Sequence, residues 1–137
     1  MAIGAGGLTG EVTCTADARV DTYVAGLTAD GERGVLAFRI DSSEPAPPAK
    51  GGNTWEVSVL DADGNLASGD LGVALDMPDH GHGSQVEPEV TYDEESGRFT
   101  ITPLYLFMAG VWRIELTLAS DADKVVDRGT FYFCIEG

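Results

Sequence analysis

Two histidines lie close together in a glycine-rich run and give this chain its clearest chemistry. His80 and His82 are the two histidines of the sequence, and they belong to residues 77–83, which read MPDHGHG. Imidazole nitrogen suits copper in both oxidation states, whereas the thioether of Met77 selects Cu(I). A glycine on either side of His82 lets the backbone fold closely around an ion. These residue types predict a soft metal site, with copper as the ion.

The same segment has two other interpretations. A harder ligand set, made of both histidines and neighbouring carboxylates, would suit Cu(II) or Zn(II). Those carboxylates are Asp76, Asp79 and Glu87. In the other interpretation the histidines belong to a polar turn, and Met77 packs in the core because methionine readily fills gaps.

The apolar residues around this run alternate with the period of β-strands, which buries one face of each strand. The predicted strands cover residues 16–25, 33–41, 53–61, 70–77, 86–92, 98–107, 111–119 and 128–135. Eight short strands with hairpin-like links predict an all-β fold, an antiparallel β-sandwich of immunoglobulin or cupredoxin type. Trp55 and Trp112 alternate with apolar residues, so we expect both to pack in its core. We expect one domain over residues 16–137, after an N-terminal extension of residues 1–15.

The chain is strongly acidic, with 8 Lys and Arg against 23 Asp and Glu and a net charge of −15. Such a surface repels phosphate backbones, which excludes nucleic-acid binding as a class of function. It also raises the local concentration of cations. No segment has the apolar length of a membrane helix, and the first residues lack the basic and apolar regions of a signal peptide. We expect no membrane insertion, and any signal peptide to lie outside this sequence.

The two cysteines, Cys14 and Cys134, lie near the two ends of the chain. If each link reverses the chain direction, the even-numbered predicted strands all end at one pole of the sandwich, where both cysteines then lie. Proximity of this kind predicts a disulfide, and with it an oxidising compartment such as a periplasm or the cell exterior. The histidine run and Met108 each follow an even-numbered strand, so they fall at the same pole. The alternative is a pair of free thiols in a cytosolic protein.

Three segments carry a resemblance to a known family. They are residues 77–83, the run GRF at 97–99 and the run LFMAGVWRI at 106–114. Over about residues 33–135 the chain resembles the YtkA-like and FixH-like domains, which are exported bacterial β-sandwiches. The resemblance implies copper handling in the cell envelope, for instance delivery of copper to a terminal oxidase. It implies the ligand set Met77, His80, His82 and Met108.

Together these observations predict an exported carrier or sequestering protein for copper, as Cu(I), that passes the ion to a copper-accepting envelope protein. We do not expect an enzyme, because no serine lies in a nucleophile elbow and both cysteines are predicted to be bonded. One alternative is an extracellular interaction module in which the histidine run is only a polar loop. Another is a copper redox protein, which would need Cys134 as a free thiolate ligand.

Overall fold

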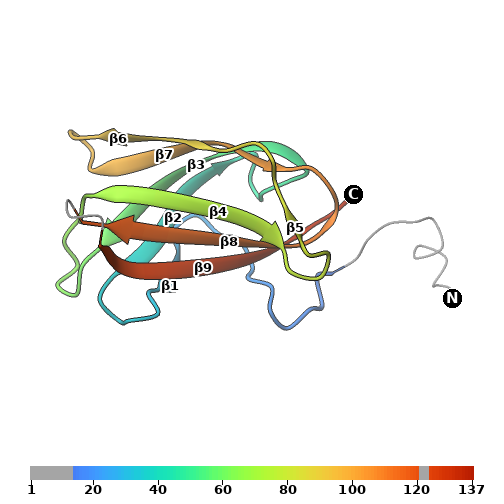
Figure 1. The fold of residues 1–137 in the computed structure, drawn as a ribbon, viewed down its shortest axis with the longest axis horizontal. Helices are drawn as coiled ribbons and strands as arrows, with labels where there is room; N and C mark the ends of the chain where they lie inside the picture. Colours follow the sequence, from blue (N-terminus) through green and yellow to red (C-terminus); the bar gives the residue numbers. More distant parts are fainter. Residues whose placement is uncertain (1–13, 121–123) are drawn as a thin grey trace, which may run out of the picture.

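The computed structural model describes residues 14–120 and 124–137, with the side chain of His82 outside the described part. Within these residues the only regular secondary structure is β-strand. The strands form two antiparallel sheets that pack face to face (Figure 1). The strands are β1 Leu27–Asp30, β2 Ala37–Glu44, β3 Gly51–Leu60, β4 Asp70–Met77, β5 His82–Gly83, β6 Glu89–Asp93, β7 Arg98–Leu106, β8 Gly110–Ala119 and β9 Val125–Ile135. One sheet has the order β1-β2-β3-β7-β6 and the other β5-β4-β8-β9. The predicted all-β sandwich is confirmed.

The core lies between the sheets and is built by the alternation seen in the sequence. On β8, Trp112 and every second residue after it are buried as far as Leu118. Trp55 of β3 is also fully buried and meets Phe131 and Phe133 of β9 edge-on, with ring centroids 6.0 and 5.7 Å apart. Burying one large apolar side chain stabilises a fold by roughly 1.5–3 kcal/mol. Both tryptophans pack in the core as predicted, and within the described ranges no helix is long and apolar enough to span a membrane.

The predicted first strand, residues 16–25, is wrong. This segment forms turns in which Asp17 N–H donates to the Cys14 carbonyl and Val20 N–H donates to the Asp17 carbonyl, at 3.0 and 3.2 Å. The Asp17 carboxylate also accepts the backbone N–H of Arg19, and this side-chain competition favours turns over strands. Asp21 then bonds the edge of β9 through Tyr132. We call residues 14–21 the strap. The edge strand of the five-stranded sheet, next to β2, is instead β1, and the short β5 is an addition to the eight predicted strands.

The predicted common pole is confirmed by the strand register. Asp76 at the end of β4 pairs with Arg113 near the start of β8, and Gly110 at that start pairs with Ile135 at the end of β9. A three-residue link, 107–109, joins the end of β7 to β8. In Figure 1 the turn before β5 and the C-terminus lie at the same end of the sandwich. We call this end the histidine pole.

At the opposite pole a buried carboxylate holds the loop between β1 and β2. Asp127 of β9 is fully buried and accepts four backbone N–H bonds of 2.8–2.9 Å. The donors are Arg33, Val35, Leu36 and Arg128. Burial alone would raise the pKa of Asp127, but the four N–H bonds outweigh it and lower this pKa to about 2. The loop therefore depends on an ionised carboxylate inside the protein.

Candidate metal site

The histidine run forms a tight turn at the end of β4. Pro78 has no N–H to continue the strand, and the carbonyl of Met77 accepts N–H bonds from His80 and Gly81, both at 3.0 Å. Gly81 has a φ of +69°, a left-handed conformation that glycine adopts readily. The chain then returns on β4, with His82 opposite Met77 in the register. The turn therefore holds the His80 ring close to the end of a buried strand.

Met77 and His80 converge on the start of β8. The Met77 side chain is fully buried, whereas His80 is exposed. A Cβ atom placed on Gly110 would lie 2.7 Å from Met77 Cε and 3.6 Å from His80 Nε2. The thioether methyl and the imidazole nitrogen therefore share the space above one glycine. Because Gly110 has a φ of +138°, its backbone conformation also favours glycine.

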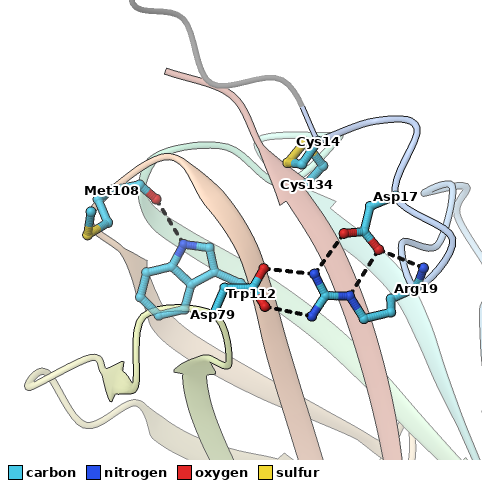
Figure 2. The surroundings of a disulfide bond; sticks show 7 residues. All are labelled: Cys14, Asp17, Arg19, Asp79, Met108, Trp112 and Cys134. Carbon is cyan, nitrogen blue, oxygen red and sulfur yellow. Dashed lines mark hydrogen bonds and ion pairs between the residues drawn. A yellow bond between two sulfur atoms is a disulfide. The ribbon is translucent and has the colours of Figure 1, made fainter.

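Met108 lies two residues before that glycine, in the link between β7 and β8. Its side chain is half-buried and packs against the core. Its carbonyl accepts the indole N–H of Trp112 at 2.9 Å (Figure 2). Trp112 in turn meets Phe107 edge-on. This bond ties the link to the core, so the Met108 backbone is held at the histidine pole. The structure thus brings Met77, His80 and Met108 to one pole, while the predicted fourth ligand, the His82 side chain, lies outside the described residues.

Arginines engage two of the three carboxylates of the harder ligand set, and the third, Glu87, is exposed in the loop after β5. Asp76 accepts two bonds from Arg113, at 2.9 and 2.6 Å, and Asp79 accepts two from Arg19, at 3.0 and 2.8 Å. Among the side chains that the structure describes, no three from His, Cys, Asp and Glu are grouped to hold a metal ion. Paired arginines compete with a metal for carboxylate oxygen. Asp76 and Asp79 are therefore held in ion pairs, whereas the uncharged Met77 thioether lies next to His80.

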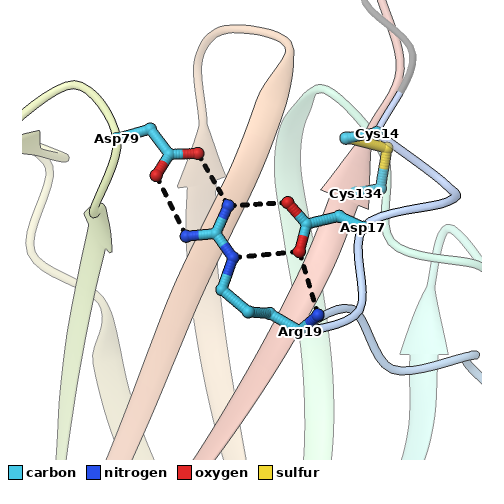
Figure 3. Close-up of polar contacts among 5 residues, drawn as sticks. All are labelled: Cys14, Asp17, Arg19, Asp79 and Cys134. Atoms are coloured by element: carbon cyan, nitrogen blue, oxygen red, sulfur yellow. Dashed lines mark hydrogen bonds and ion pairs between the residues drawn. A yellow bond between two sulfur atoms is a disulfide. The ribbon is translucent and has the colours of Figure 1, made fainter.

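A disulfide and an arginine bring the strap to this pole. Cys14 and Cys134 are bonded to each other, as predicted, with their Cα atoms 5.4 Å apart. Arg19 then lies between two carboxylates, those of Asp17 and Asp79 (Figure 3). The Arg19 side chain lowers the pKa of Asp17 to about 2 and also lowers the pKa of Asp79. In return, the two carboxylates raise the pKa of Arg19.

Sequence reasoning missed Arg19 and Gly110. Arg19 meets Asp79 across 60 positions of the chain, a separation that periodicity does not report. One signal was present, because Arg19 is the one basic residue of the described part that precedes Arg33. Gly110 lies within the run 106–114 that carries the family resemblance, but the sequence predicted no role for it.

The fold and the site define an antiparallel β-sandwich domain with imidazole and thioether donors at one pole. The family model described as YtkA-like matches residues 33–117, and the chain belongs to this family. The matched range contains Met77, His80, His82 and Met108 but neither the strap nor Cys134. No curated protein and no solved structure was found to match the chain.

Proposed function

We propose that this protein is an exported carrier or sequestering protein for copper, which it binds as Cu(I) at the histidine pole. The observation that carries the proposal is the convergence of Met77 Cε and His80 Nε2 above Gly110. Met108 lies in the link between β7 and β8, so a second thioether is present at the same pole. Imidazole with thioether is the donor set that Cu(I) favours in proteins.

The surrounding charges support a soft ion over a hard one. Cu(II) and Zn(II) would draw on the carboxylates of Asp76 and Asp79, and each of these is held by an arginine. Cu(I) needs no carboxylate, so it binds without breaking either ion pair. The disulfide supports an oxidising compartment, because such bonds persist outside the reducing cytosol. There, with both cysteines bonded, methionine is the remaining soft sulfur ligand.

The acidic surface indicates what charge a partner protein would carry. A net charge of −15 favours encounter with a positively charged protein and raises the local concentration of metal cations. A copper-accepting envelope protein with a basic docking face fits this chemistry. Carriage of this kind requires no bond making in a substrate, so we do not assign an enzymatic activity.

Competition titrations with Cu(I) and Cu(II) chelators test the proposal. We expect His80→Ala and His82→Ala each to lower the affinity for both ions by about tenfold or more, because imidazole binds both. Met77→Leu and Met108→Leu should lower the Cu(I) affinity and leave the Cu(II) affinity unchanged. Leucine nearly conserves the apolar volume, so a methionine with a packing role alone would leave both affinities unchanged.

The control for these titrations is Gln85→Ala, which changes an exposed polar residue shortly after β5. Its affinities should equal those of the wild type. Copper binding that is unchanged in both histidine variants would contradict the proposal. Unchanged Cu(I) binding in both methionine variants would instead indicate a site made of histidine and carboxylates.

The second candidate function is an interaction module, and one surface feature favours it. A hollow of about 710 Å³ beside β5 is lined by Gly83, Gln85, Val86, Tyr105 and Phe107. Val86 and Tyr105 are 40% and 39% exposed, so apolar area faces solvent there. A hollow with exposed apolar walls can receive an apolar side chain of a partner protein. If copper binding is absent, this hollow becomes the leading candidate for function.

A further inference from the structure

We propose that Arg19 is a positioning residue for the metal site, which it serves by clamping Asp79 and so holding the turn that carries His80. The inference rests on the proposed function and adds a part of the chain to the site. Arg19 belongs to the strap, which lies outside the residues matched by the family model. Of the two clamp residues, Asp79 lies inside the matched range and Arg19 lies outside it.

The geometry of the clamp is specific for arginine. Nε and Nη2 of Arg19 donate to Asp17 at 2.9 and 2.7 Å, while Nη1 and Nη2 donate to Asp79 at 3.0 and 2.8 Å (Figure 3). A planar guanidinium can bond two carboxylates along two of its edges at once. The compact ammonium of lysine cannot reproduce this pattern. Arg19 therefore sets both the distance and the orientation of the Asp79 carboxylate.

The strap is attached firmly enough to act as an anchor. At one end Cys14 is bonded to Cys134 of β9. At the other end Asp21 accepts the N–H of Tyr132 and donates its own N–H to the Tyr132 carbonyl, at 2.9 and 2.8 Å. Arg19 lies between these two attachments, so its position is fixed relative to the edge of β9.

The clamp joins parts of the sheet that do not pair with each other. In the order β5-β4-β8-β9, strand β8 separates β9 from the turn that follows β4. Arg19 crosses this separation from the β9 side and reaches Asp79, the neighbour of His80 in the chain. The backbone bonds inside the turn are local, from His80 and Gly81 to the Met77 carbonyl. The clamp therefore supplies a long-range restraint on the position of the His80 ring.

Loss of the ion pair between Arg19 and Asp79 should affect the position of His80 more than the free energy of unfolding. The Arg19 and Asp79 side chains are 39% and 54% exposed, and exposed ion pairs contribute little to the free energy of unfolding. Residues that orient a metal ligand from outside the coordination sphere can nevertheless change metal affinity 10–100-fold, by the usual order of magnitude. Loss of the clamp should therefore weaken copper binding in a protein that stays folded.

The test uses the full chain with the substitutions Arg19→Ala, Asp79→Asn and both together. Arg98→Ala is the matched control, because Arg98 is 48% exposed, forms ion pairs with Asp41 and Glu56, and lies at the start of β7, away from the histidine pole. The first measurement is the NMR spectrum of the imidazole rings in metal-free protein, which is simple because the chain has two histidines. The second is anaerobic competition titration with Cu(I) alone.

A positioning role and a purely electrostatic role of Arg19 predict different changes in the Cu(I) affinity of the variants. If Arg19 only repels copper, Arg19→Ala raises the Cu(I) affinity while Asp79→Asn lowers it. If Arg19 positions the turn, both substitutions lower the affinity by about tenfold and the double variant is no weaker than the single ones. Both should shift or broaden the same ring signal, and Arg19→Lys should restore the wild-type values only in part. Arg98→Ala should match the wild type in both measurements.

Opposite signs for the two single variants would overturn the clamp, and so would ring signals identical to those of the wild type. The two readouts also separate this proposal from the proposed function. If the wild type fails to bind Cu(I), the copper function fails, and the ring signals still decide whether Arg19 positions the turn. If the wild type binds Cu(I) and the clamp variants bind it equally well, only the clamp fails.

Discussion

Met77 and Gly110 lie against each other where the end of β4 passes the start of β8. A Cβ atom at Gly110 would lie 2.7 Å from the Met77 methyl, closer than carbon atoms approach without displacement. The absent side chain thus leaves the space into which the methyl fits. Because His80 Nε2 reaches the same space, a fully buried core side chain comes next to an exposed imidazole. Met77 therefore belongs both to the core and to the candidate site.

We expect Gly110→Ala to displace Met77 and His80 together. The added methyl and the φ of +138° should lower the free energy of unfolding by about 2 kcal/mol, measured by urea denaturation. The Cu(I) affinity should fall by about tenfold in the same protein. The control is Gly64→Ala, which has a φ of +83° but nothing within 4 Å of the added atom. Its Cu(I) affinity should not change, and equal affinities in the two variants would contradict a shared space.

We expect the disulfide to stabilise the whole fold. It joins residues 120 positions apart, so it removes much of the chain entropy of the unfolded state. Cys14→Ser combined with Cys134→Ser should lower the free energy of unfolding by about 4 kcal/mol in urea denaturation. Intact-mass measurement before and after reduction and alkylation checks the bond itself. Two thiols that react with alkylating reagent in native, unreduced protein would refute the bond and the expectation of an oxidising compartment.

We expect the stability contributed by Asp127 to disappear in acid. Its folded pKa of about 2 lies below the unfolded value of about 3.9, so its contribution is complete at neutral pH and is lost as the pH falls through about 4 to 2. Asp127→Asn should lower the free energy of unfolding by roughly 2 kcal/mol at pH 7. In urea denaturation the difference from the wild type should still be complete at about pH 5 and should narrow as the pH is lowered through about 4 to about 3.

Asp63→Asn is the matched control for this measurement. Asp63 is an exposed carboxylate in the turn between β3 and β4, so its substitution should change the free energy of unfolding by less than about 0.5 kcal/mol. A difference between Asp127→Asn and the wild type that stays constant with pH would show that the charge of Asp127 does not matter.

We expect the fold to survive removal of metal. The core contains Trp55, Trp112 and many other buried apolar side chains, so the chain needs no ion to fold. Treatment with a chelator should leave the β-sheet signal in circular dichroism intact. Adding Cu(I) to about 100 times its dissociation constant should raise the free energy of unfolding by about 2.7 kcal/mol. Collapse of the signal on chelation would make the metal structural rather than cargo.

The sequence alone determined most of the strands, the sandwich class and the residues at one pole, but not the order of the strands in the two sheets. Period-two burial is a local property, so alternation located β4 at its observed bounds, Asp70–Met77, and placed Trp112 in the core. Reversal of direction at each link then brought Cys134 and the histidine run to the same end. The error over residues 16–25 did not disturb this result, because β1 still runs antiparallel to β2.

Only the tertiary structure decided which side chains meet. Arg19 reaches Asp79 across 60 positions, and Asp127 collects donors more than 90 positions away. Such contacts depend on which loops pack side by side, and the local pattern of apolar residues does not specify this. The convergence of Met77 and His80 above Gly110 has the same origin, because it requires the ends of β4 and β8 to be placed in register. The spacing of residues in the sequence indicates which side chains are candidate metal ligands, and the tertiary packing determines which of them lie close together.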